Sequence, residues 1–156
     1  MTIDDAKLSF ISVPINTLRE DSVTDFDVYI RMRKGQEPVL YRQRKLVFTH
    51  EALERLQKNQ VTQVFVKTDQ ETAYHRYVED HLGDFLADEN QSVEVKSELL
   101  YSSAQGLIKD VMADPRAGDT VPRSKKLVEN TCKFLFENKN AFHSLLDVVS
   151  FDYYTY

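Results

Sequence analysis

The first part of the chain alternates short apolar segments with turn residues, a pattern typical of strands. Leu8–Val13 is apolar, Phe26–Met32 partly alternates apolar and polar residues, and Val61–Val66 is rich in β-branched and aromatic residues. Pro14 restricts the first segment to a sheet edge or a strand end, because proline has no amide hydrogen to donate to a neighbouring strand. The pattern therefore predicts three strands.

A hairpin and a short helix complete this region. The turn residues Lys34–Pro38 separate Phe26–Met32 from Val39–Arg42, so these two segments are expected to pair. Thr49 is a suitable N-cap for a helix that ends near Asn59.

After the third strand the hydrophobic period becomes that of a helix. Thr68–Glu71 matches a capping box, and apolar residues recur at helical spacing from Tyr74 to Phe85. Val93–Met112 repeats this helical spacing. This half of the chain is therefore expected to be helical.

After Met112 the sequence predicts a break followed by a last helix. Asp114–Asp119 interrupts the helical pattern, and a further helix begins near Pro122. The expected fold class is α+β: a small mixed sheet with short helices, followed by a helical bundle or linker. We expect a regulatory domain over residues 1–89 and a connecting helical region over residues 90–156.

The last helical stretch carries the most regular apolar pattern. Six residues follow a/d-like spacing over about three heptads: Val128, Thr131, Leu135, Phe142, Leu145 and Val149. Asn138–Asn140 either lies within this seam or breaks it, with Asn140 capping a new helix. The seam packs against the Val93–Met112 helix, forms a homodimer interface, or receives a partner helix.

Composition and charge narrow the class of protein. The chain is 42% hydrophobic and 29% charged, which excludes a disordered or membrane-embedded chain, and its net charge of −5 disfavours general nucleic-acid binding. No basic-then-apolar leader pattern is present at the N-terminus. We therefore expect a cytoplasmic protein with neither nucleic acid nor membrane as a partner. Cys132, the sole cysteine, is expected to be a small core residue.

The sequence contains no assembled catalytic or metal-binding motif. The four histidines have no convergent set of metal ligands; His75 and Glu79, one helical turn apart, come nearest to one. The four glycines form no phosphate-binding loop. We assign no catalytic and no metal-binding residue.

Basic residues gather around the predicted hairpin. The candidates for binding an anion or a nucleotide are Arg31, Arg33, Arg42 and Arg44. Pairing of the two strands is expected to place Arg31 and Arg42 on one face. The alternative is a solvated hairpin face without a ligand.

The segment Asp152–Tyr156, Asp-Tyr-Tyr-Thr-Tyr, resembles the opening of the catalytic domain of HD-GYP proteins, bacterial phosphodiesterases that hydrolyse cyclic di-GMP. Five segments are similar to the N-terminal regulatory region of some members: Phe10–Leu18, Phe26–Ile30, Val39–Arg42, Phe48–Thr49 and Val61–Val66. The family's metal-binding residues, its His-Asp doublet and its Gly-Tyr-Pro loop are not in this sequence. The resemblance thus implies that a centre of two or three iron or manganese ions belongs only to a catalytic domain beyond this chain.

The resemblance implies a non-catalytic regulatory and dimerising module, cut just before its catalytic domain. Such a module would set the position or dimeric arrangement of that domain in cis. Two alternatives remain: an anion- or nucleotide-binding module that uses the arginine-rich hairpin, and a protein-docking domain. An independent enzyme has the least support, because no acid–base pair or nucleophile is assembled.

Overall fold

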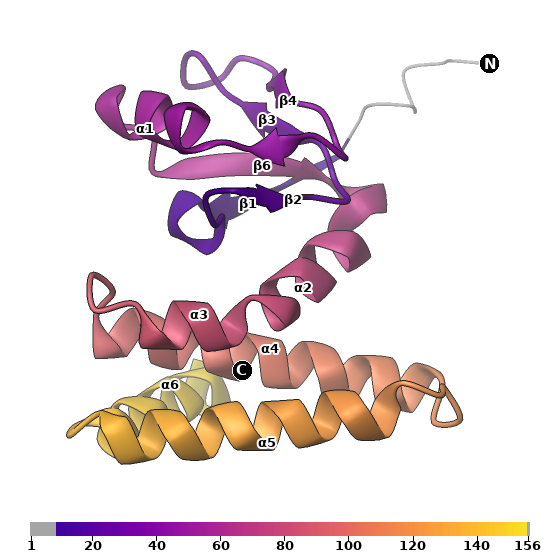
Figure 1. Cartoon of the computed structure of the whole chain (residues 1–156), viewed down its shortest axis with the longest axis vertical. Helices are drawn as coiled ribbons and strands as arrows, with labels where there is room; N and C mark the ends of the chain where they lie inside the picture. The colour runs from indigo at the N-terminus through magenta and orange to yellow at the C-terminus, as the bar shows by residue number, and fades with distance from the viewer. Residues whose placement is uncertain (1–8, 156) are drawn as a thin grey trace. The chain divides into compact units, whose positions relative to one another are not determined.

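The structure is a computed structural model that describes residues 9–155 (Figure 1). The chain divides between Val78 and Glu79 into two compact units. The first unit contains the strands and the second consists of helices, so the predicted α+β class is confirmed. The division falls within helix α2, Glu71–Asp80. The predicted boundary at residues 89/90 separates a regulatory domain from a connecting region. It was defined by these roles and not by compactness, so it stays a prediction.

The first unit is built around a four-stranded sheet with the order β1-β6-β3-β4. A separate two-stranded sheet pairs β2 with β5. All described strand pairs are antiparallel, which refines the expectation of a mixed sheet. The strands are β1 (Phe10–Pro14), β2 (Ser22–Val23), β3 (Val28–Ile30), β4 (Val39–Arg42), β5 (Val47–Phe48) and β6 (Gln63–Lys67). Leu8, expected to begin the first strand, lies outside the described residues.

The predicted hairpin of β3 and β4 is confirmed. Gly35 lies in its turn with φ of 89°, a left-handed conformation that glycine adopts without steric cost. The register shifts between Val28 and Tyr29, which marks a bulge in the pairing. Val64 and Val66 of β6 are fully buried and form part of the core of this unit.

Helix α1 spans His50–Lys58 and begins as predicted. The Thr49 hydroxyl accepts a hydrogen bond from the amide of Ala52 at 3.1 Å, which satisfies one donor of the first turn. The capping box predicted at Thr68–Glu71 is wrong. Thr68–Gln70 instead forms a short 3-10 turn, as does Ile15–Thr17, and the Glu71 carboxylate lies 3.3 Å from His75 Nε2.

Two buried tyrosines fix helix α2 in the core of the first unit. The rings of Tyr74 and Tyr77 meet Phe26 edge-on, with centroids 5.5 and 5.4 Å apart. The Tyr74 hydroxyl donates to Thr17 Oγ1 at 2.9 Å, and the Tyr77 oxygen lies 2.7 Å from Ser22 Oγ. Burial raises the pKa of Tyr74 to about 12, so its hydroxyl stays protonated and available as a donor.

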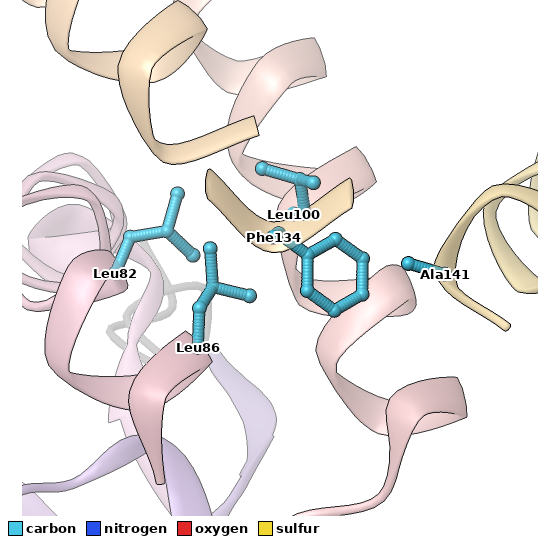
Figure 2. Close-up of a cluster of buried hydrophobic side chains, with 5 residues drawn as sticks. All are labelled: Leu82, Leu86, Leu100, Phe134 and Ala141. Atoms are coloured by element: carbon cyan, nitrogen blue, oxygen red, sulfur yellow. The ribbon is translucent and has the colours of Figure 1, made fainter. Parts of the chain in front are cut away.

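The second unit consists of four helices around one apolar cluster. Leu82, Leu86, Leu100, Phe134 and Ala141 form this cluster, with side chains from all four helices (Figure 2). The helices are α3 (Leu82–Ala87), α4 (Val93–Ala113), α5 (Thr120–Glu137) and α6 (Ala141–Thr155). No helix in the described part of the chain is long and apolar enough to cross a membrane.

Candidate functional site

The heptad-like seam is divided between two helices. Helix α5 ends at Glu137 and helix α6 begins at Ala141, so Asn138–Asn140 is a break, one of the two predicted alternatives. Asn138 Nδ2 donates to the carbonyl of Phe134 at 2.9 Å and so satisfies a carbonyl at the end of α5. The six seam residues are therefore shared equally between α5 and α6.

Three seam residues are at least partly buried within the helical unit itself. Leu135 and Leu145 pack against the apolar cluster. Thr131 is half-buried, and its hydroxyl donates to the carbonyl of Leu127 at 2.7 Å. This part of the seam therefore serves intramolecular packing, which was one of the alternatives.

The other three seam residues face solvent. Val128, Phe142 and Val149 have 60, 62 and 39% of their surface exposed. On α5, Val121 and Phe136 lie on the same helix face as Val128 by their spacing, and Leu146 lies with Phe142 and Val149 on α6. We call these residues the exposed stripes: Val121, Val128 and Phe136 on α5, and Phe142, Leu146 and Val149 on α6.

Cys132 also lies on the exposed face of α5. It is four residues from both Val128 and Phe136, and its side chain is exposed. The expectation that Cys132 is a core residue is wrong. Apolar residues occur on both the buried and the exposed face of α5, so the sequence around Cys132 did not show which face it occupies.

The four candidate arginines are not gathered at one site. Arg42 pairs with Val28 at one end of the hairpin, whereas Arg31 follows Ile30, which pairs with Val39 near the turn. The strand register therefore places Arg31 and Arg42 at different ends of the hairpin, and the two side chains do not line one site. The Arg42 guanidinium instead donates from Nε and Nη2 to the Val47 carbonyl, at 3.0 and 2.6 Å.

Arg44 has a structural contact through its backbone. Its amide donates to Asp27 Oδ1 at 2.7 Å, and its side chain is exposed. Neither Arg42 nor Arg44 lines the recess described next.

Arg31 and Arg33 do come together, with two cations that were not among the four candidates. They line a recess of about 910 Å³ together with Lys34, from the same turn, and Arg55, from α1. We call this site, defined by Arg31, Arg33, Lys34 and Arg55, the cationic recess. Nothing in the sequence indicated Arg55, because it reaches the recess only through the packing of α1 beside the hairpin.

One wall of the cationic recess is apolar and aromatic. Ile30, Tyr41, Leu56 and Val61 contribute to it. The Tyr41 hydroxyl donates to the Ala52 carbonyl at 2.9 Å, which fixes the ring against α1. The recess thus combines positive charge with a hydrophobic surface, a composition that suits an anion with an apolar part.

A second hollow, of about 650 Å³, lies between α4 and α6. Its lining is acidic and includes Glu94, Glu98, Asp147 and Asp152. Asp152 Oδ2 accepts hydrogen bonds from the Tyr101 hydroxyl at 2.7 Å and from Gln105 Nε2 at 3.2 Å. These contacts connect the end of α6 to α4.

His75 and Glu79, the nearest approach to a metal-ligand pair in the sequence, contact other side chains instead. The Glu71 carboxylate approaches His75, whereas Glu79 binds Arg123, so the possible His75–Glu79 ligand pair is not formed. In the described part of the chain no three His, Cys, Asp or Glu side chains are placed to hold a metal ion.

Comparisons with known proteins give one loose likeness. No protein-family model matches the chain, and no curated protein matches it. The structure resembles that of Bd1817, an HDG"Y"P protein from Bdellovibrio bacteriovorus, with a TM-score of 0.45 and 21% sequence identity. The likeness covers 89% of this chain but only 45% of Bd1817, so the chain spans less than half the length of that protein.

Proposed function

We propose that this chain is a non-catalytic regulatory and dimerising module of a bacterial HD-GYP-type protein. The observation that carries the dimerising role is the pair of exposed stripes on α5 and α6. Exposed apolar residues that recur on one face of a helix form a patch, and large exposed apolar patches mark interaction surfaces. Phe136, with 93% of its surface exposed, would lose the most contact with water on association.

We assign the occupant of the stripes as a second copy of the chain. Within each helix, exposed apolar residues lie seven apart: Val121 and Val128 on α5, and Phe142 and Val149 on α6. This spacing keeps them on one helix face, where the same face of a second copy can pack. Two of the remaining seam residues, Leu135 and Leu145, pack against the apolar cluster, so the helices that carry the stripes are held by a core of their own. Symmetric homodimers are the commonest assembly of soluble chains.

The HD-GYP assignment is supported by the motif Asp152–Tyr156 and by the similarity of the strand segments to the family's regulatory region. In this proposal the parent protein carries the metal-dependent cyclic di-GMP phosphodiesterase domain in cis. The module would act by changing how two such domains are arranged, which requires two arrangements of similar energy.

Sedimentation velocity over a range of protein concentrations tests the dimer. The wild-type chain is expected to dimerise, and Phe142→Asp and Val149→Asp are expected to shift it towards monomer with unchanged helical circular dichroism. Lys126→Gln is the matched control, because it makes the same change of charge at an exposed position of α5 away from the stripe. A wild-type chain that stays monomeric into the high micromolar range would remove the dimerising role.

The gene sequence beyond Tyr156 tests the family assignment. It is expected to encode a His-Asp doublet and a Gly-Tyr-Pro loop. The longer protein should then hydrolyse cyclic di-GMP with manganese or ferrous iron, and the chain of 156 residues should not. Hydrolysis by the short chain would contradict the non-catalytic assignment.

A further inference from the structure

We propose that the cationic recess binds the polyphosphate group of a small anion, with a nucleoside triphosphate as the class that fits best. The site belongs entirely to the first unit and is distinct from the exposed stripes. The inference therefore stands or falls independently of dimerisation.

The first support is a group of cations without carboxylate partners, of which Arg31 instead lies over the Phe65 ring at 4.5 Å from its centroid. Arg31, Arg33, Lys34 and Arg55 line one recess, and none of them forms an ion pair with a carboxylate among the described residues. Elsewhere in the same unit, Lys58 lies 3.2 Å from the Glu54 carboxylate. Four like charges on a concave surface repel one another, and a multivalent anion would relieve that repulsion. The chain as a whole has a net charge of −5, so this local group of four cations is opposite in sign to the rest of the protein.

The second support is the origin of the cations on separate elements. Arg33 and Lys34 lie in the hairpin turn, where the amide of Gln36 donates to the Arg33 carbonyl at 3.1 Å. Arg55 comes from the last turns of α1. Cations on two elements can approach one phosphate chain from two sides, and arginine suits this role because its planar guanidinium binds two phosphate oxygens at once.

The end of α1 lies beside the recess, and the partial negative charge of a helix C-terminus disfavours an anion there. Gln60 has φ of 59°, and in this conformation its amide donates to the Gln57 carbonyl at 3.0 Å. The Val61 amide donates to the Leu56 carbonyl at 3.0 Å. These bonds satisfy carbonyls at the helix C-terminus, so they reduce but do not remove this effect, and the cations must outweigh the rest.

The apolar wall gives the reason for a nucleotide rather than a bare phosphate. The Tyr41 ring is held by its hydrogen bond to Ala52, next to Ile30 and Val61. A ring fixed in this way offers a surface for a base, with little loss of side-chain entropy on binding. The cations would hold the phosphates while the wall contacts the base.

Isothermal titration calorimetry of the whole chain with ATP and with inorganic tripolyphosphate tests the inference. Both probes are expected to bind more weakly as salt concentration rises. The double variant Arg33→Gln/Arg55→Gln is expected to weaken binding by at least about tenfold, since each lost guanidinium removes charge-assisted hydrogen bonds. Arg44→Gln/Arg116→Gln removes the same charge at exposed sites outside the recess and is expected to leave the affinity within about twofold.

Each result decides the matter. Tighter binding of ATP than of tripolyphosphate supports the full inference, and Tyr41→Ala should then reduce the difference. Equal binding of both probes supports the polyphosphate site and removes the role of the wall. Absence of heat with either probe at millimolar concentration, or an equal loss of affinity in both double variants, overturns the proposal.

Discussion

The Arg123 guanidinium forms two parallel hydrogen bonds with the Glu79 carboxylate, from Nε to Oε1 at 2.9 Å and from Nη2 to Oε2 at 2.7 Å. Nη2 also donates to Asp110 Oδ2 at 2.9 Å, so α5 is tied to α4 and to the end of α2. Both partners of the main pair are largely buried, with 11 and 13% of their side-chain surface exposed. The hydrogen bond to Glu79 raises the pKa of Arg123 further above its already high value.

Substitution Arg123→Met is expected to destabilise the helical unit by about 2–4 kcal/mol, because it leaves the Glu79 carboxylate largely buried without its partner. Urea denaturation followed by circular dichroism measures the change. Lys126→Met, at an exposed position on the same helix, is the control and should cost no more than about 0.5 kcal/mol. Equal stability of the two variants would show that the pair contributes nothing.

The two buried tyrosines of α2 should differ in their contribution to stability. The Tyr77 oxygen accepts from the Arg19 amide at 2.7 Å and also contacts Ser22 Oγ, whereas the Tyr74 hydroxyl has the one contact with Thr17 described above. We expect Tyr77→Phe to cost about 1–3 kcal/mol and Tyr74→Phe about 0.5–1.5 kcal/mol. Thermal or urea unfolding of both variants checks the order, and a larger cost for Tyr74→Phe would contradict this account.

Aspartate substitutions on α5 should separate the buried part of the seam from the exposed part. Leu135→Asp places an unpaired charge against the apolar cluster and is expected to unfold the helical unit, since such burial costs several kcal/mol. Val128→Asp adds the same charge in solvent and should leave the helical circular dichroism unchanged. If both variants unfold, Val128 is buried in solution; if both fold, the packing of Leu135 is wrong.

His50 is expected to titrate above its usual pKa of 6.5, because its ring nitrogen forms a hydrogen bond with the Glu20 carboxylate at 2.5 Å. A raised pKa in the folded chain means that the contact stabilises the fold at low pH. This contribution is fully present below pH 6.5 and is lost as the pH rises through the folded pKa.

Proton NMR of the imidazole across this pH range measures the shift of His50. Glu20→Gln should return the pKa of His50 towards 6.5. Glu54→Gln removes a carboxylate 3.7 Å from the other ring nitrogen and should lower this pKa less, because the Glu20 hydrogen bond is the larger cause of the shift. A His50 pKa that does not respond to Glu20→Gln would exclude the contact.

Local chemistry explains which parts of the fold were predictable. The Thr49 cap, the β3–β4 hairpin and the break at Asn138–Asn140 depend on residues close together in the sequence. Partners distant in the sequence were not predictable. The pairing of Ile30 with Val39 sets the strand register that separates Arg31 from Arg42, and α1 brings in Arg55 from outside the hairpin. Pairing of Glu79 with Arg123 likewise depends on how α5 packs.

The exposed position of Cys132 makes the chain convenient to label. It contains one cysteine, so a thiol-reactive fluorophore or spin label would attach at a single place without any engineered substitution. That place lies one helical turn from Val128 and one from Phe136. A fluorophore there would report whether the exposed face of α5 becomes covered. A spin label there would give the distance to the same label on a second copy.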